Sequence, residues 1–414
     1  MTGTPTSADV LEAANILAPL GMRTPLVLNQ RLSALCGTDV FLKREDLSLV
    51  RSYKGRGARV AVEALKASGH DAVVCASAGN HAQGVAAACA ALSMSCSVVV
   101  PVTTPRQKRE RILALNPNTS LIVAGRTYDE SYAHAVELSL SSNAALIPAF
   151  DHPSVIAGQG TVALEVLEDL HLLGIPSACM VAPVGGGGLL AGSALALTGT
   201  AISLIGVEPE NAASWRAARK AGQPVSLSVM DSFVDGAAVA RVGALPFAIA
   251  SNSTTVLQVP EGAVATAMLE LYQQDGIIAE PAGALALAAV PQVLALIPNQ
   301  PLVLVISGGN NDVSRYAEVL ERSLVFQGIK QYFLLEFDQV PGALRRFLDS
   351  ALGPGDDIVL FEYVKKSNRE SGPALVGIEL SDPQALEALQ RRMTETGIRF
   401  ERVEPGSSLQ RFLV

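Results

Sequence analysis

Apolar and polar positions follow two different patterns along the chain, and the first pattern covers most of it. Between about Leu42 and Gly309, short runs of apolar and β-branched residues alternate with longer, alanine-rich stretches. The apolar runs predict strands buried on both faces, and the alanine-rich stretches predict helices. The clearest predicted strands are residues 71–77, 96–101, 178–184, 203–209 and 302–308. This order indicates an α/β fold with open, twisted, mostly parallel sheets. Ligands in such folds bind beyond the carboxyl ends of the strands.

The pattern changes after about Phe326, where more strictly alternating segments begin. They predict strands and helices in the order βαββαβ, which is the ferredoxin-like α+β arrangement. The predicted segments are strand 329–338, helix 340–352, strand 357–366, strand 374–380, helix 383–397 and strand 400–404. We therefore expect a large region at 1–325, with a small subdomain at about 50–150, and a second domain at 326–414. A helix within 312–328 would connect the two.

Composition and charge narrow the class of protein. The net charge of −8 over 414 residues argues against nucleic acid as a partner, because phosphate contacts need clustered Lys and Arg. Residues 172–207 carry no charge, but Pro183 and four consecutive glycines interrupt the run, so we expect no membrane span. The five cysteines are scattered without paired spacing, and the N-terminus lacks a signal-peptide pattern. These features predict a globular protein of the cytoplasm.

One lysine stands in an unusual setting. Lys54 has Gly55 and Gly57 close behind it, at the start of a helical stretch that follows a charged strand. An isolated lysine is nearly always a solvated surface charge. Neighbouring glycines, however, let a lysine approach a bound carbonyl closely, as a Schiff-base former must. This context makes Lys54 a candidate nucleophile.

A loop of small residues follows the strand predicted at 71–77 and opens a helix. It consists of Ser77, Ala78, Gly79, Asn80 and His81. Small residues at such a place leave free backbone N–H groups, which suit an anion. The side chains of Asn80 and His81 could equally be ordinary helix caps. The loop alone does not decide between these readings.

A second loop lies between a buried strand and a helix rich in Ala and Leu. Its residues are Gly185, Gly186, Gly187, Gly188 and Leu189. Four consecutive glycines let the backbone wrap a phosphate and point its N–H groups inward. A tight turn would explain one or two of them. The spacing Gly186-x-Gly188-x-x-Ala191, with Glu208 about twenty residues on, also fits the fingerprint of an NAD(P)-binding dehydrogenase.

Two further residues are candidates for a binding site. Ser307 ends a buried strand and precedes two glycines, where it is either a turn residue or a hydrogen-bonding group for a cofactor ring. Glu280 precedes an alanine-rich helix. Its charge there is explained at least as well by the helix dipole as by catalysis.

Taken together, the motifs SYKGRGA, SAGNHAQG, VGGGGL, EPAGA and SGGN occur in the order found in the fold-type II pyridoxal-phosphate enzymes. The chain resembles the serine/threonine dehydratase branch of that family over roughly residues 10–320. The ordered set also argues against an NAD(P)-binding dehydrogenase, because that interpretation would leave Lys54, Asn80 and Ser307 without a role. The resemblance implies two open α/β domains that bind pyridoxal 5'-phosphate.

The resemblance also implies a role for each candidate residue. Lys54 would hold the cofactor as a Schiff base, and the amides of Gly185–Leu189 would hold its phosphate. Asn80 would hydrogen-bond the ring hydroxyl, and Ser307 the pyridine nitrogen. The loop from Ser77 to His81 would receive the substrate carboxylate. L-Threonine would then lose water, with freed Lys54 as the base for the Cα proton, and hydrolysis of the enamine product would give 2-oxobutanoate and ammonia.

Two positions sharpen the comparison with neighbouring branches of the family. Serine racemases carry a hydroxyl residue at the position of Ala78, and alanine cannot transfer a proton, so we expect poor racemase activity. Relatives with a divalent-cation site place an acidic residue near Ser214. Serine there makes such a site doubtful despite Glu208, and we expect no metal.

The module at the C-terminus resembles the ACT-like regulatory domain of biosynthetic threonine dehydratases. Residues 337–348, 356–372 and 374–380 carry the match. It implies the first step of isoleucine biosynthesis, with allosteric control by isoleucine and valine, in a homodimer or homotetramer. A packing or dimerisation module is the alternative for this domain. For the whole chain, the alternatives are a related serine dehydratase and an amino-acid sensor without catalysis.

Overall fold

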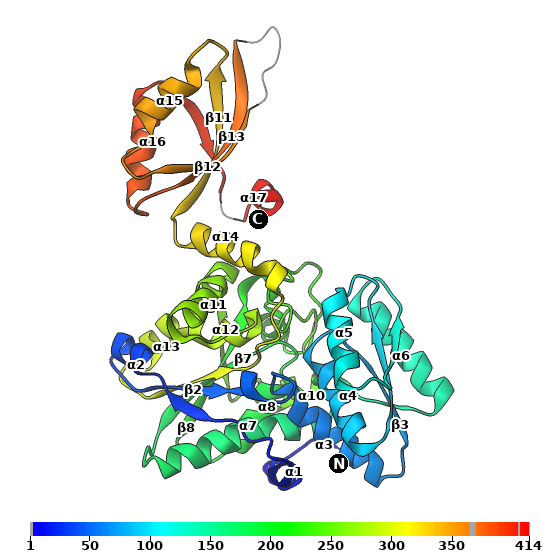
Figure 1. The fold of residues 1–414 in the computed structure, drawn as a ribbon. Helices are drawn as coiled ribbons and strands as arrows, with labels where there is room; N and C mark the ends of the chain where they lie inside the picture. Colours follow the sequence, from blue (N-terminus) through cyan, green and yellow to red (C-terminus); the bar gives the residue numbers. More distant parts are fainter. Residues whose placement is uncertain (1–2, 364–369, 405, 414) are drawn as a thin grey trace. The chain divides into compact units, whose positions relative to one another are not determined.

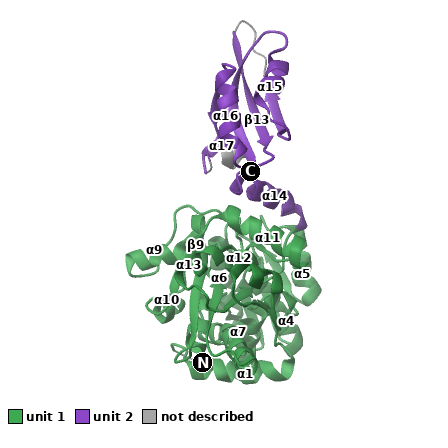
Figure 2. Cartoon of the chain, turned by 90° about the vertical axis from the view of Figure 1, so that its left-hand side faces the viewer, with its two compact units in different colours: residues 1–312 green, residues 313–414 purple. Residues whose placement is uncertain are grey.

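The computed structural model describes residues 3–363, 370–404 and 406–413. Contacts divide the chain into two compact units, Met1–Asp312 and Val313–Val414 (Figure 2). The first unit contains two sheets and the second contains one. Residues 364–366 of the strand predicted at 357–366 lie outside the described residues, as does part of the segment 356–372.

The large sheet of the first unit has six strands in the order β1-β2-β10-β7-β8-β9. All neighbouring pairs are parallel except β1 and β2, which are antiparallel. The strands are β1 (Leu26–Leu28), β2 (Val40–Arg44), β7 (Ala178–Pro183), β8 (Ile202–Pro209), β9 (Thr255–Val259) and β10 (Leu302–Ile306). Every residue of β7 and β10 is buried, as expected for a parallel strand between two layers of helices.

Helices cover both faces of this sheet (Figure 1). One face packs against α7 and α8, whose apolar side chains share a core with β7 and β10. The other face contacts α12. The helices around the large sheet are α1 (Ser7–Leu17), α2 (Gln30–Cys36), α7 (Pro153–Leu172), α8 (Gly188–Ala196), α9 (Ser214–Ala221), α10 (Ala244–Ala250), α11 (Glu261–Asp275), α12 (Pro281–Ala288) and α13 (Val290–Leu296).

The small sheet of the first unit is entirely parallel, in the order β5-β4-β3-β6. Its strands are β3 (Ala72–Ala76), β4 (Ser95–Val100), β5 (Ser120–Val123) and β6 (Ala145–Leu146). One face shares a core with α3 and α4, and α6 packs on the other face. The accompanying helices are α3 (Lys54–Ala67), α4 (Asn80–Leu92), α5 (Arg106–Leu115) and α6 (Tyr128–Ser142).

The second unit has the predicted βαββαβ order. Its elements are α14 (Tyr316–Phe326), β11 (Lys330–Asp338), α15 (Ala343–Ala351), β12 (Asp357–Tyr363), β13 (Ser371–Glu379), α16 (Ala385–Glu395), β14 (Arg399–Arg402) and α17 (Ser408–Leu413). The sheet order β12-β13-β11-β14 is antiparallel throughout and is that of a ferredoxin-like fold. Both fold classes predicted from the sequence are therefore confirmed.

The prediction omitted four strands, and all four lie at sheet edges. They are β1, β5, β6 and β9. An edge strand is paired on one side only, and these strands are short or mostly half-exposed, so they lack the continuous apolar runs that mark the central strands. The short helix α17 was also not predicted.

Candidate active site

The predicted site residues lie where strands of the two sheets in the first unit end and helices begin. Lys54 is the first residue of α3, Asn80 the first residue of α4, and Gly188 the first residue of α8. Ser307 directly follows β10, and Glu280 directly precedes α12. The motifs thus occupy the carboxyl ends of β3, β7 and β10, the edge at which α/β folds bind ligands.

Backbone hydrogen bonds join three of these motifs to one another. The amide of Tyr53 donates to the carbonyl of Ser307 over 3.1 Å, and the amide of Glu280 donates to Gly308 over 3.0 Å. The amide of Gly309 donates to the carbonyl of Arg51 over 2.9 Å. The segment before Lys54, the end of β10 and the start of α12 are therefore fixed against each other, although they are far apart in sequence.

Lys54 is partly buried, and its Nζ donates a hydrogen bond to the carbonyl of Ala149 over 2.9 Å. The same nitrogen lies 5.4 Å from the ring centre of Tyr53 and 6.0 Å from that of Phe150. Desolvation lowers the pKa of Lys54 to about 8, although the carboxylate of Glu280 opposes the shift. At pH 7 roughly a tenth of the amine is therefore uncharged, far more than for an ordinary lysine, and a nucleophile or base must be uncharged.

The glycine loop has no room for side chains. A Cβ on Gly186 would lie 2.2 Å from Cγ of Phe150, and one on Gly185 would lie 2.9 Å from Cα of Ala237. Gly187 has φ +90°, a conformation that L-residues rarely adopt, and it caps α8. Phe150 touches this loop, and the preceding residue, Ala149, accepts a hydrogen bond from Lys54. The loop and the lysine therefore lie against the same short segment.

Asn80 is held at both ends of its amide group. Its Nδ2 donates to Oε1 of Glu280 over 2.6 Å, and its Oδ1 accepts from Nδ2 of Asn310 over 2.7 Å. Glu280 is buried, and desolvation followed by the nearby charge of Asp235 raises the pKa of its carboxyl to about 7. The structure thus brings Glu280 into direct contact with a predicted site residue.

The loop before α4 leads into a helix that no side chain caps. The amide of Gly79 meets Oγ of Ser77 over 3.2 Å, and Gly79 caps α4 with its backbone. His81 is buried, and its Nε2 contacts the carbonyl of Ile147 over 2.9 Å. Burial, with a smaller effect of Lys54, lowers the pKa of His81 to about 3, so the ring is neutral at physiological pH. Neither its side chain nor that of Asn80 caps the helix.

Glu208, the acidic residue of the dinucleotide fingerprint, is used elsewhere. Its carboxylate accepts from the amides of Trp215 and Arg216 over 2.8 and 3.0 Å and so holds the start of α9. It also accepts from Nε2 of Gln258. Ser214 is the buried first residue of the same helix. Over residues 3–363, 370–404 and 406–413, no three His, Cys, Asp or Glu side chains group as a metal site would require.

Several residues of the site were not singled out by the sequence. Asn310 is the last residue of the SGGN motif, but the sequence indicated no role for it. Ala149 and Phe150 belong to none of the motifs. Beneath Lys54, the buried Arg56 pairs with Glu45 over 2.8 Å and with Glu165 over 2.5 Å. A charged residue two positions after the lysine was the one available signal for this network, but charge alone does not predict burial.

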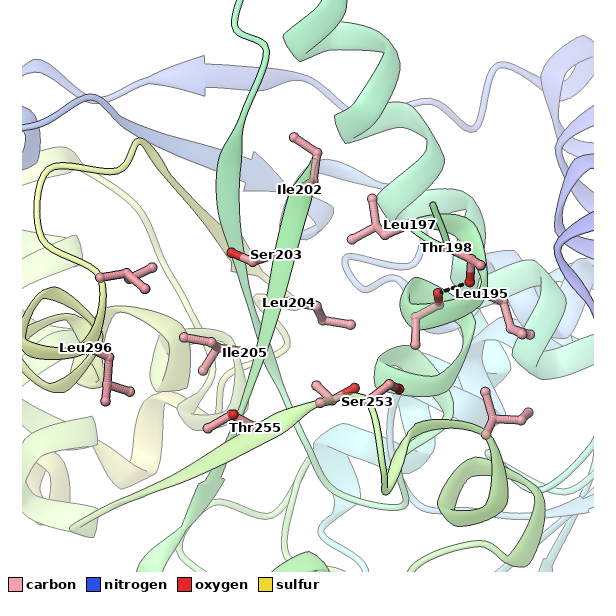
Figure 3. Close-up of a pocket in the computed structure, with 14 residues that line it drawn as sticks. Leu195, Leu197, Thr198, Ile202, Ser203, Leu204, Ile205, Ser253, Thr255 and Leu296 are labelled. Atoms are coloured by element: carbon pink, nitrogen blue, oxygen red, sulfur yellow. Dashed lines mark hydrogen bonds between the residues drawn. The ribbon is translucent and has the colours of Figure 1, made fainter. Parts of the chain in front are cut away.

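A hollow of about 650 Å³ lies away from this site (Figure 3). It lies at the amino ends of β8 and β9, opposite the carboxyl ends that carry the motifs. Its lining is largely apolar and includes Leu195, Ile202, Leu204 and Leu296. None of the predicted site residues contributes to it.

No helix in the described ranges has both the length and the apolar character of a membrane span.

Comparisons with known proteins agree with this division of the chain. Residues 17–308 match the family model described as pyridoxal-phosphate dependent enzyme. Residues 321–413 match the C-terminal regulatory domain of threonine dehydratase. The chain is 52% identical to the L-threonine dehydratase biosynthetic IlvA of Mycobacterium tuberculosis, over 98% of this chain and 96% of that protein. It is 42% identical to the protein of the same name from Bacillus subtilis, over 98% and 96%.

Solved structures give the same picture for the first unit. Threonine deaminase isoform 2 from Solanum lycopersicum, in its processed form, matches with a TM-score of 0.70 and 36% identity, over 78% of this chain and 96% of that one. Serine racemase from Dictyostelium discoideum matches with a TM-score of 0.68 and 29% identity, over 75% and 100%.

Proposed function

Because the chain belongs to the pyridoxal-phosphate-dependent enzymes, and within them to the threonine dehydratase family, we propose that it converts L-threonine to 2-oxobutanoate and ammonia. One observation carries the assignment to this site. The amine of Lys54, whose pKa is lowered, contacts Ala149, and the glycine loop contacts the adjacent Phe150. This reaction opens isoleucine biosynthesis, in keeping with the biosynthetic relatives.

The residues of the site fit pyridoxal phosphate. Four residues of the glycine loop have no side chain of their own to cover the backbone N–H groups at the start of α8, which suits a phosphate. Lys54 supplies an amine that is free of any acidic partner within hydrogen-bonding distance among the described residues. The amides of Gly185–Leu189 would hold the phosphate, Asn80 would meet the ring hydroxyl, and Ser307 would meet the ring nitrogen.

The chain's own residues divide the chemistry among them. When bound, pyridoxal phosphate supplies a carbonyl for the substrate amine and draws off the electron pair left at Cα. The Nζ of Lys54 would hold the cofactor and would also serve as the base that takes the Cα proton. The loop from Ser77 to His81 orients the substrate carboxylate through its backbone N–H groups. Because Ala78 cannot return a proton from the opposite face, elimination is favoured over racemisation.

The second unit would bind an amino-acid effector, for which the match to a regulatory domain gives the support. Gly342 has φ +83° and caps α15, and the first N–H groups of that helix suit a carboxylate. We propose inhibition by isoleucine, relief by valine, and assembly as a homodimer or homotetramer in the cytoplasm.

The visible absorption spectrum tests the proposed function directly. The purified protein should be yellow and should form 2-oxobutanoate from threonine, whereas Lys54→Ala should lose both the band and the activity. Lys66→Ala is the matched control, because Lys66 stands on the same helix and is exposed, and its Nζ hydrogen-bonds only the carbonyl of Leu92 among the described residues. It should behave like the wild type.

Two outcomes would contradict the proposal. A wild-type protein that remains colourless and inert after pyridoxal phosphate is supplied would favour a sensor without catalysis. A strong preference for serine over threonine would instead identify a serine dehydratase. The similarity to a serine racemase structure is the reason to test this alternative.

A further inference from the structure

Asn310 stands at the centre of a chain of hydrogen bonds behind the predicted ring-hydroxyl contact. Its Nδ2 donates to the backbone carbonyl of Val50 over 2.8 Å and to Oδ1 of Asn80 over 2.7 Å. Nδ2 of Asn80 then donates to Oε1 of Glu280 over 2.6 Å. The Oδ1 of Asn310 is buried and accepts no hydrogen bond from the described residues. Only the donor end of its amide is therefore engaged.

The direction of this chain is determined by its first member. A backbone carbonyl can only accept, so Val50 requires the nitrogen of Asn310 to face it. The same nitrogen faces Asn80, which must therefore present its oxygen to Asn310 and its nitrogen to Glu280. A planar amide nitrogen carries two hydrogens, and with one directed at Glu280 the direction of the second is fixed as well.

Without Asn310, the orientation of Asn80 would depend on Glu280 alone. A carboxylate only accepts, but a protonated carboxyl also donates, so it could face either end of the Asn80 amide. Asn310 removes this ambiguity because it is neutral and is held by the main chain. It also lies one residue after Gly309, whose amide is fixed to the carbonyl of Arg51.

We propose that Asn310 is a positioning residue that keeps the amide nitrogen of Asn80 directed at the ring hydroxyl of the bound cofactor. The inference rests on the proposed function, since it assumes that pyridoxal phosphate binds at Lys54. Asn310 itself acts on the cofactor only through Asn80. This predicts that its effect on the cofactor disappears when the Asn80 side chain is removed.

A double-mutant cycle on cofactor affinity tests the proposal. Asn310→Asp is close in shape but only accepts, so it repels Oδ1 of Asn80 and favours the flipped amide. We expect Asn80→Ala and Asn310→Asp each to weaken pyridoxal phosphate binding by roughly tenfold and to shift the visible band. The double variant should bind within about twofold of Asn80→Ala alone. Dissociation constants are measured by titrating the apoprotein and following absorbance.

Asn311→Asp is the matched control. Asn311 is the adjacent asparagine, and its Nδ2 contacts only the carbonyl of Ala279, over 3.3 Å. It should leave the dissociation constant and the band unchanged. The melting temperature of each apoprotein checks folding, and Asn310→Ala replaces Asn310→Asp in the cycle if the latter does not fold.

The outcomes separate this inference from the proposed function. If the wild type binds no pyridoxal phosphate, the proposed function fails and the inference fails with it. If the wild type binds and Lys54→Ala loses the band, but Asn310→Asp binds as the wild type does, only the inference is overturned. Additive losses in the double variant would likewise overturn it, because Asn310 would then act independently of Asn80.

Discussion

The large sheet of the first unit and the sheet of the second unit differ in how many of their faces are buried. Every residue of β7 and β10 is buried, whereas β11 alternates in its second half, where Leu335 and Phe337 are buried and Glu336 and Asp338 are exposed. A sheet with both faces covered leaves its strand ends as the place for chemistry. A sheet with one face covered keeps a second face for solvent or another molecule.

The two sheets also pack with their helices in different ways. In the first unit, helices approach each other backbone to backbone, as at Gly192 of α8 and Gly160 of α7. In the second unit, aromatic rings fill the space, and Phe337 meets Phe347 edge-on with ring centres 5.4 Å apart. We infer that the first unit has little tolerance for added volume, because its closest contacts involve backbone that cannot rotate away.

The largest expected effect is therefore that of Gly192→Ala. Its Cβ would lie 2.3 Å from the carbonyl oxygen of Ile156 and 2.5 Å from the amide nitrogen of Gly160. Helices α7 and α8 would have to separate, which we expect to cost about 5 kcal/mol or more, above the usual range for overpacking. Urea unfolding of the soluble protein, or its absence from the soluble fraction, measures the effect.

Gly377→Ala in β13 is the counterpart in the second unit. Its Cβ would meet side chains, Cε1 of Tyr332 at 2.9 Å and Cβ of Leu360 at 3.0 Å. The ring of Tyr332 can rotate away, and the contact with Cβ of Leu360 is less close, so we expect a loss of about 1–3 kcal/mol. Equal losses for the two variants would contradict the difference in packing between the units.

The sequence predicted the central strands and both fold classes because burial on two faces, or alternation on one, leaves a periodic pattern. It did not predict the edge strands, which lack such a pattern. Only those parts of the candidate site that leave a local pattern in the sequence could be predicted. Glycines and a lysine at strand ends are visible in sequence, whereas the contact of Asn310 with Asn80, 230 positions apart, depends on how β10 and α4 are placed. Phe150 and Trp215 beside the glycine loop are tertiary neighbours of the same kind.

Arg56→Met should have the next largest effect. The guanidinium of Arg56 is buried between Glu45 and Glu165, while Lys43 also pairs with Glu165 over 2.6 Å. Removing Arg56 leaves two carboxylates with one cation, which we expect to cost about 3–5 kcal/mol. Arg59→Met is the control, because its pair with Glu63 is a partly exposed contact within one helix and should cost below about 1 kcal/mol. Denaturant unfolding of both variants compares them.

The Glu280 carboxyl should make stability depend on pH. Its pKa is raised on folding from an ordinary 4.5 to about 7, mainly by burial, so the folded protein binds this proton more tightly. Its stabilising contribution is then fully present below pH 4.5 and is lost as the pH rises through 7, with a full range of about 3 kcal/mol. Glu280→Gln should remove this dependence.

The measurement is the free energy of unfolding of the apoprotein at several pH values between 4.5 and 8. The difference between Glu280→Gln and the wild type should grow with pH in favour of the variant. A difference that is constant across this range would show that Glu280 has an ordinary pKa. Glu63→Gln provides the reference for a partly exposed carboxylate.

The smallest effect is expected on the exposed face of the second unit. Arg399 on β14 pairs with Glu336 on β11 over 2.6 Å, and the two side chains are 70% and 52% exposed. Since water and salt screen such a pair, Arg399→Met should cost about 0.2–1 kcal/mol, and less at about 1 M salt. Unfolding of the full chain at low and high salt measures this. A loss of several kcal/mol that salt does not reduce would mean that this face is covered in solution, and the contrast between a sheet covered on both faces and a sheet open on one would no longer hold.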